Sequence, residues 1–145
     1  MVKETLQIRK VDLKDLDEIV SFLSIAGSSL YSFRYFDYRP LKVINNHLIT
    51  ILLYQGDNPV GYGHLDKDGN TIWLGIAIAP NVRGKGLGKK VMQFLVDYSD
   101  ENNIKELSLT VEKNNSAGIT LFQNFGFISI SDVNTRSILM KRTIN

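Results

Sequence analysis

A glycine-rich, basic stretch over residues 83–90, RGKGLGKK, is the strongest chemical signal in the sequence. It lies between an expected strand and an expected helix, where unpaired backbone N–H groups and the positive end of the helix dipole come together. Glycine allows the backbone to approach a ligand closely, and one arginine and three lysines add positive charge around the same point. The pattern predicts a phosphate-binding turn.

Two familiar phosphate-binding patterns do not fit this stretch. A P-loop requires G-x-x-x-x-G-K-[ST], but Arg83 stands where the first glycine of a pattern ending at Gly88 would be. A dinucleotide fingerprint requires G-x-G-x-x-G, but after Gly84 and Gly86 the third glycine comes one position early. The spacing therefore argues against nucleotide hydrolysis and against nicotinamide chemistry.

The composition limits the other kinds of chemistry. The chain has 145 residues, no cysteine and two histidines, His47 and His64, so we expect neither a disulfide nor a metal site. The 17 Lys and Arg against 15 Asp and Glu give a net charge of +2, too small to indicate a nucleic-acid or membrane partner. The N-terminal residues lack a signal-peptide core, and the longest apolar stretch, 72–80, is far shorter than the roughly 18 residues of a membrane span. We therefore expect a cytoplasmic protein.

The elements that must position these residues are predicted from apolar periodicity, which indicates one α+β domain over residues 1–145. The expected order is strand, helix, three strands in an antiparallel meander, helix, strand, helix and two strands. Asp12 is expected to cap the first helix. The predicted ranges are 5–11, 13–24, 47–54, 59–66, 71–79, 87–102, 104–111, 116–124, 127–130 and 136–140. The first helix is expected to bury Leu13, Leu16, Ile19, Val20 and Leu23.

A third phosphate-binding pattern, [QR]-x-x-G-x-[GA], fits Arg83, Gly86 and Gly88. In this pattern the chain resembles the GNAT superfamily of acetyl-CoA-dependent N-acetyltransferases. Residues 76–88 resemble the family's fourth strand, phosphate loop and following helix, and residues 107–127 resemble its fifth strand, next helix and a Gly-Phe pair. The resemblance implies the GNAT fold, a mixed, mostly antiparallel central sheet with splayed fourth and fifth strands, flanked by helices.

The resemblance also implies how acetyl-CoA, the expected cosubstrate, is held. The fourth strand would bind the pantetheine arm through its backbone, and the N–H of Ile76 or of a near neighbour would stabilise the tetrahedral oxyanion. Asn115 matches a position that often contacts the coenzyme, and it fits the first turn of a helix equally well. The residues expected to bind the coenzyme are Ile76, Ile78, Arg83, Gly84, Lys85, Gly86, Leu87, Gly88, Lys89 and Asn115.

Two positions depart from the family's pattern. Phe122 stands where many members carry a tyrosine that protonates the departing thiolate, and Ile72 stands where histone-modifying members carry a glutamate base. A thiol with a pKa near 8.5 leaves as thiolate at modest cost near neutral pH, so water or another hydroxyl can supply the proton. Tyr62, Tyr35 and Tyr38 are the candidate hydroxyls.

His64 is the candidate for the missing general base. Strand alternation places Tyr62, His64 and Asp66 on one face of the expected strand. Of these three side chains, imidazole has the unperturbed pKa closest to neutral pH. A half-buried structural histidine is the alternative role, and Glu112 and His47 are further candidates for the base.

A cluster of aromatic and arginine side chains over residues 30–39, LYSFRYFDYR, falls where the family forms much of its acceptor site. Aromatic planes beside arginines suit a ligand with a ring and a phosphate. Packing under a loop explains the same cluster equally well. The candidate acceptor-binding residues are Arg34, Tyr35 and Arg39.

These observations predict an N-acetyltransferase in which a primary amine attacks the thioester directly. An amine of low pKa suits a site without a carboxylate base, because it is largely unprotonated at neutral pH. Together with the aromatic cluster, this favours an amino sugar, free or linked to a nucleotide, as the small-molecule acceptor. The alternatives are a protein N-terminal or lysine acetyltransferase, an enzyme for another small amine, and a non-catalytic acyl-CoA-binding module. A homodimer is one possible assembly.

Overall fold

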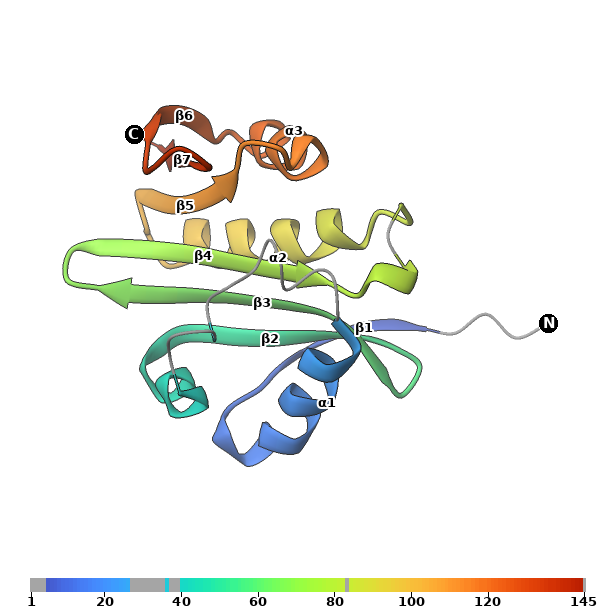
Figure 1. Ribbon diagram of the computed structural model, residues 1–145. Helices are drawn as coiled ribbons and strands as arrows, with labels where there is room; N and C mark the ends of the chain where they lie inside the picture. Colours follow the sequence, from blue (N-terminus) through green and yellow to red (C-terminus); the bar gives the residue numbers. More distant parts are fainter. Residues whose placement is uncertain (1–4, 27–35, 37–39, 83, 145) are drawn as a thin grey trace.

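A seven-stranded sheet forms the centre of the molecule, in the order β1-β2-β3-β4-β5-β7-β6 (Figure 1). The structure is a computed structural model and describes residues 5–26, 36, 40–82 and 84–144. Neighbouring strands are antiparallel except for β4 and β5, which run parallel. The strands are β1 (Leu6–Lys10), β2 (His47–Gln55), β3 (Asn58–Asp68), β4 (Thr71–Ile78), β5 (Glu106–Glu112), β6 (Ile128–Asp132) and β7 (Ser137–Thr143).

Three α-helices and three short 3-10 helices connect these strands in the described part of the chain. They are η1 (Leu13–Asp15), α1 (Leu16–Ala26), η4 (Leu41–Asn46), η5 (Pro80–Val82), α2 (Leu87–Glu101) and α3 (Ser116–Asn124). The order and type of these elements confirm the predicted α+β fold. None of the described helices has the length and apolar character that crossing a membrane requires.

The helices α1 and α2 pack on opposite faces of the sheet. On one face the ring of Phe22 in α1 stacks on Tyr62 in β3, with centroids 6.3 Å apart. On the other face α2 approaches the backbone of β3 so closely that a Cβ on Gly63 would lie 2.7 Å from Val91. Because adjacent strand residues point to opposite faces, we name these the α1 face and the α2 face.

The apolar stripe of α1 differs from the prediction. Ile19, Phe22 and Ala26 are fully buried, whereas Leu16 and Val20 are 36% and 47% exposed. The capping role of Asp12 is confirmed, because its carboxylate accepts a hydrogen bond from the N–H of Lys14 at 2.8 Å. However, the capped turn is a separate 3-10 turn of three residues, and within α1 the packing on the sheet selects a face shifted towards Phe22 and Ala26. The expectation was therefore wrong for Leu16 and Val20.

A single backbone pairing joins β4 to β5. Trp73 pairs with Ser108, and beyond this point the two parallel strands diverge towards their C-terminal ends (Figure 1). The splayed arrangement that the family resemblance implied is therefore present. The region of the sheet between the diverging strands is called the wedge below.

Tyr54 of β2 lies buried on the α1 face, outside the region of the wedge. Burial, followed by the neighbouring Glu18 carboxylate, raises the pKa of its hydroxyl well above the usual range. The guanidinium of Arg9 lies 4.5 Å from the centre of its ring. The hydroxyl therefore stays protonated and uncharged near neutral pH.

Among the strands that the structure describes, β6 is an edge of the sheet and pairs only with β7. Its pairing is irregular, because the register shifts between Ser129 and Ser131. Ile128 and Ile130 are 63% and 49% exposed, and Val133 just after the strand is 52% exposed. This edge therefore combines exposed apolar side chains with a break in the ladder.

Candidate active site

The glycine-rich turn between β4 and α2 has the backbone geometry that an anion site requires. Gly84 and Gly86 both have positive φ, +81° and +75°, a conformation that favours glycine. A Cβ at either position would have no described atom within 4 Å. Gly86 is the N-cap of α2, and among the described residues no side chain hydrogen-bonds to this cap. Within the described part of the chain, no side chain therefore satisfies the N–H groups of the first helical turn.

The other residues of the turn have different roles. Lys85 and Lys89 are exposed, so their ammonium groups can reach an anion at the turn. Gly88 lies in a packed position instead, because a Cβ there would come within 3.1 Å of Leu121 in α3 and 3.9 Å of Ile78. Glycine at this position lets α2 approach α3 and β4 closely. Arg83, expected to bind the same anion, lies outside the described residues.

Among the described residues, the part of β4 that borders the wedge has no paired strand on the β5 side. The N–H of Ala79 donates to the carbonyl of Val60 at 2.8 Å, which places the amides of alternate residues, including Gly75, towards β3. The intervening amides of Ile76 and Ile78 must therefore point away from β3. They point towards β5, and on that side the only described backbone pairing of β4 is at Trp73.

Asn115 is the N-cap of α3. Its side-chain oxygen accepts a hydrogen bond from the N–H of Gly118 at 2.9 Å. This contact explains Gly118, because a Cβ there would lie only 2.5 Å from the Asn115 amide nitrogen. The structural role is thus present, and the amide nitrogen is the group left to contact a coenzyme.

His64 and Tyr62 form a buried hydrogen-bonded pair on the α1 face of β3. The Tyr62 hydroxyl lies 2.7 Å from Nδ1 of His64, and the two residues are 0% and 1% exposed. The ring of Phe36 contacts Tyr62 edge-on at 5.9 Å. The shared face follows from strand alternation, as predicted.

A second imidazole lies beside this pair. The ring of His47 in β2 is 4.5 Å from the ring of His64, and its Nδ1 lies 2.8 Å from the Thr50 hydroxyl. A register shift between His47 and Ile49 places His47 opposite Asp66, on the face that carries His64. The sequence named His47 as a candidate but carried no sign of the shift that positions it.

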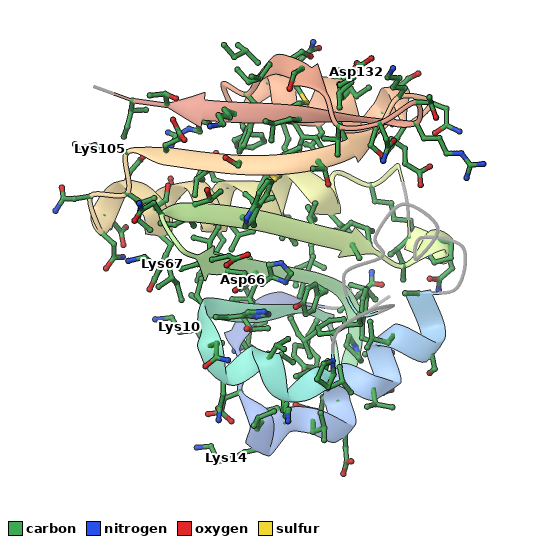
Figure 2. The ribbon with its side chains drawn as sticks, turned by 60° about the vertical axis from the view of Figure 1, so that its left-hand side comes forward. Lys10, Lys14, Asp66, Lys67, Lys105 and Asp132 are labelled. Atoms are coloured by element: carbon green, nitrogen blue, oxygen red, sulfur yellow. The ribbon has the colours of Figure 1, made fainter. Side chains whose placement is uncertain are left out.

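Three strands bring these side chains together in cross-strand rows on the α1 face. Figure 2 shows Asp66 over the broad face of β3, at the end of the strand next to Lys67. Among the described residues, no three His, Asp or Glu side chains are grouped closely enough to hold a metal ion. The rows from β2 through β3 to β4 are His47–Asp66–Trp73, Thr50–His64–Gly75 and Leu52–Tyr62–Ala77.

The remaining candidates lie apart from this cluster or cannot be placed. Glu112 is the last residue of β5, four residues beyond the pairing with β4, and it pairs with Ser137 of β7. Phe122 is buried against Phe127, and Ile72 is half-buried at the core. Four further candidates, Arg34, Tyr35, Tyr38 and Arg39, lie outside the described residues.

The chain belongs to the GNAT family of acetyltransferases. A sequence profile described as the acetyltransferase (GNAT) family matches residues 14–127, which is more than half of the chain. The match includes β2 to α3, and hence the glycine-rich turn, the wedge and the His64 cluster. The family resemblance inferred from the sequence is confirmed.

Individual relatives agree with this assignment. The uncharacterized N-acetyltransferase YfmK of Bacillus subtilis (strain 168) is 28% identical, over 57% of this chain and 56% of YfmK. The probable spermine N(1)-acetyltransferase of Bacillus subtilis subsp. natto (strain BEST195) is 35% identical, over 52% of this chain and 56% of the relative. The chain thus spans little more than half the length of each.

A solved structure shares the whole fold. The crystal structure of the PaiA N-acetyltransferase from Thermoplasma acidophilum, in complex with coenzyme A, superposes with a TM-score of 0.74. The superposition covers 97% of this chain and 99% of that one, at 19% sequence identity. The likeness is therefore one of fold.

Substitution of Asn115 tests its capping contact through the stability of the protein. We expect Asn115→Ala to lower the free energy of unfolding by about 1 kcal/mol, because the first turn of α3 loses its cap. Asn115→Asp keeps an accepting oxygen and should stay close to the parent. Urea denaturation measures both effects, and an alanine variant as stable as the parent would contradict the capping role.

Proposed function

We propose that the single domain over residues 1–145 is an acetyl-CoA-dependent N-acetyltransferase that acts on a primary amine. The observation that carries the proposal is the wedge. Its β4 edge presents the N–H groups of Ile76 and Ile78, and it lies next to a turn where a Cβ at Gly84 or Gly86 would meet no described atom within 4 Å. A backbone edge beside an anion site suits a ligand that has an amide-containing arm and a pyrophosphate.

The chain's own groups have defined tasks in this proposal. The turn and the lysines Lys85 and Lys89 hold the pyrophosphate, and the amide of Ile78 holds the pantetheine arm. The N–H of Ile76 donates to the thioester carbonyl oxygen and stabilises the negative charge that develops on it. Acetyl-CoA supplies the activated acetyl group, and no covalent bond to the protein is needed.

The transfer itself exchanges one bond for another. The lone pair of the amine nitrogen forms a bond to the carbonyl carbon, and the bond from that carbon to sulfur breaks. The electron pair of this bond leaves with sulfur as a thiolate, and the amine loses one proton to a base. Water or the Tyr62 hydroxyl supplies a proton to the thiolate, since Phe122 cannot donate one.

We assign the base to His64, acting directly or through a water molecule. When Nδ1 carries the proton and donates to the Tyr62 oxygen, Nε2 keeps the lone pair that accepts a proton. The 2.7 Å contact with Tyr62 supports this arrangement by fixing the ring. In this role Tyr62 positions the base.

The acceptor is proposed to be an amine of low pKa, such as an amino sugar, free or linked to a nucleotide. No carboxylate stands at position 72 of β4, and a low-pKa amine needs the least help with deprotonation. Arg34, Tyr35 and Arg39 are the proposed contacts to its ring and phosphates. Spermine, which the name of one relative gives as its substrate, is the polyamine alternative.

The turn is tested by placing a charge at Gly86. Gly86→Asp should abolish measurable acetyl-CoA binding in calorimetry. The repulsion between its carboxylate and the pyrophosphate should weaken binding about 100-fold or more. A Cβ at this position has no described atom within 4 Å, so the fold should persist, although the φ of +75° strains any side chain there. Gly86→Asn is the matched control, since it has the same shape without the charge and tolerates positive φ. Unchanged affinity in the aspartate variant would refute the assignment of the turn.

The base is tested through the pH dependence of the reaction. In the parent, kcat/KM should fall as pH decreases and the base becomes protonated. His64→Gln should remove this acidic limb and lower kcat/KM by about 100-fold, with acetyl-CoA affinity retained. The control is His47→Gln, which changes the neighbouring imidazole. If the limb survives in the His64 variant and disappears in the His47 variant, the base is His47.

The acceptor is tested with a panel of amines, with release of free coenzyme A as the readout. We expect a nucleotide-linked amino sugar or glucosamine to be used better than glycinamide, spermine or a peptide with a free N-terminus. Arg34→Ala and Arg39→Ala should raise the KM for the nucleotide-linked sugar, because the phosphates lose their partners. Preference for spermine or the peptide would contradict the amino-sugar proposal, and no turnover with any amine would indicate a non-catalytic acyl-CoA-binding module.

A further inference from the structure

The backbone conformation of Gly75 in β4 does not explain why this residue is glycine. Its φ is outside the positive region found at Gly56, Gly69, Gly84 and Gly86, so any residue could adopt its conformation. Glycine inside a strand weakens the strand and commonly marks a place where something must approach the backbone closely. Gly75 is half-buried, and the α2 helix packs on the other face of the sheet. The approach must therefore come from the α1 face.

The register places Gly75 between the proposed base and the wedge. His64 of β3 is its cross-strand partner, and Ile76, the next residue, presents its N–H to the wedge on the opposite edge of β4. Neighbouring strands are about 4.8 Å apart, so one strand separates the His64 side chain from the wedge. That strand carries no side chain on the α1 face at this point.

The opposite face offers no comparable passage. At the level of Gly63, which pairs with Ile76, a Cβ would already meet Val91 at 2.7 Å and Leu95 at 3.0 Å. The helix α2 therefore closes the α2 face at this row. A molecule that reaches the thioester beside Ile76 while in reach of His64 must cross the α1 face of β4.

We propose that Gly75 is the passage by which the acceptor amine reaches the thioester, and that the missing side chain there sets how bulky the carbon bearing the amine can be. The inference rests on the proposed function. Trp73, two residues earlier on the same face, bounds the passage on one side, and Ala77, two residues later, bounds it on the other. The passage thus admits an amine from the α1 face of β4, while the coenzyme arm lies along the edge of β4 that borders the wedge.

The experiment adds side chains at Gly75 in steps, with Gly75→Ala and Gly75→Val. The first measurement is kcat/KM for two amines of the panel, the smallest and the bulkiest that the parent acetylates. The acetyl-CoA dissociation constant and the Tm of each variant are measured as well. We expect kcat/KM for the bulkiest amine to fall at least tenfold in the alanine variant and further in the valine variant. The loss for the smallest amine should be less, acetyl-CoA affinity should stay within twofold, and the Tm should be equal or higher.

Leu74→Ile is the matched control, because Leu74 is adjacent in β4 but is buried on the α2 face. It should leave the ratio between the two amines unchanged. Equal losses for both amines, weakened acetyl-CoA binding, or the same change of ratio in the control would overturn the role of Gly75. A parent that acetylates none of the amines would overturn the proposed function itself, so the two failures are distinguishable.

Discussion

The single backbone pairing of Trp73 with Ser108 is the constraint on which the rest of the structure depends. Parallel neighbours normally continue their hydrogen bonds along their length, and backbone groups that lose this partner must find another or face water. Here the sheet is effectively two antiparallel parts, β1 to β4 and β5 with β7 and β6, that meet at one point. The helix α2 packs on β3 and β4 of the first part. It reaches the second part through the ion pair of Asp100 with Arg142 in β7 and through the close approach of Gly88 to Leu121 in α3. Contacts of α2 with both parts thus accompany the divergence of β4 from β5.

Strand register also determines which polar side chains meet inside the sheet. His47, Thr50, Tyr62 and His64 come from two strands and would be costly to bury alone. Cross-strand alignment, with one register shift, brings them within hydrogen-bonding or ring contact of one another. A buried imidazole held by such contacts keeps one orientation. These contacts therefore fix the geometry of the cluster, which lies beside β4 through the pairing of His64 with Gly75.

Local signals in the sequence were sufficient to predict much of this architecture. The meander was predictable because its turns carry Gly56 and Gly69, which the structure shows at positive φ, and alternation was enough to place Tyr62 and His64 on one face. The predicted limits of α3 agree with the structure because Asn115 caps it.

Other features depended on contacts that a sequence pattern does not contain. The buried face of α1 was predicted wrongly because apolar residues lie around most of this helix, and only its packing on the sheet selects Ile19, Phe22 and Ala26. The register shift at His47 has no residue signature, and its position emerges only when β2 pairs with β3. Gly88 belongs to a phosphate-binding motif, yet the structure shows that it also permits contact between α2 and α3. Gly88 therefore both fits the motif and allows close helix packing, and only the structure shows the packing.

The broken ladder of β6 has a consequence for how copies of the chain behave in concentrated solution. An edge strand with exposed isoleucines is a template on which another strand can add and begin aggregation. The shift between Ser129 and Ser131 interrupts the regular spacing of the strand and bends it. An incoming strand can then match only a few residues before it loses register. The irregularity in β6 thus limits fibre-like growth at the edge where Ile128 and Ile130 face solvent.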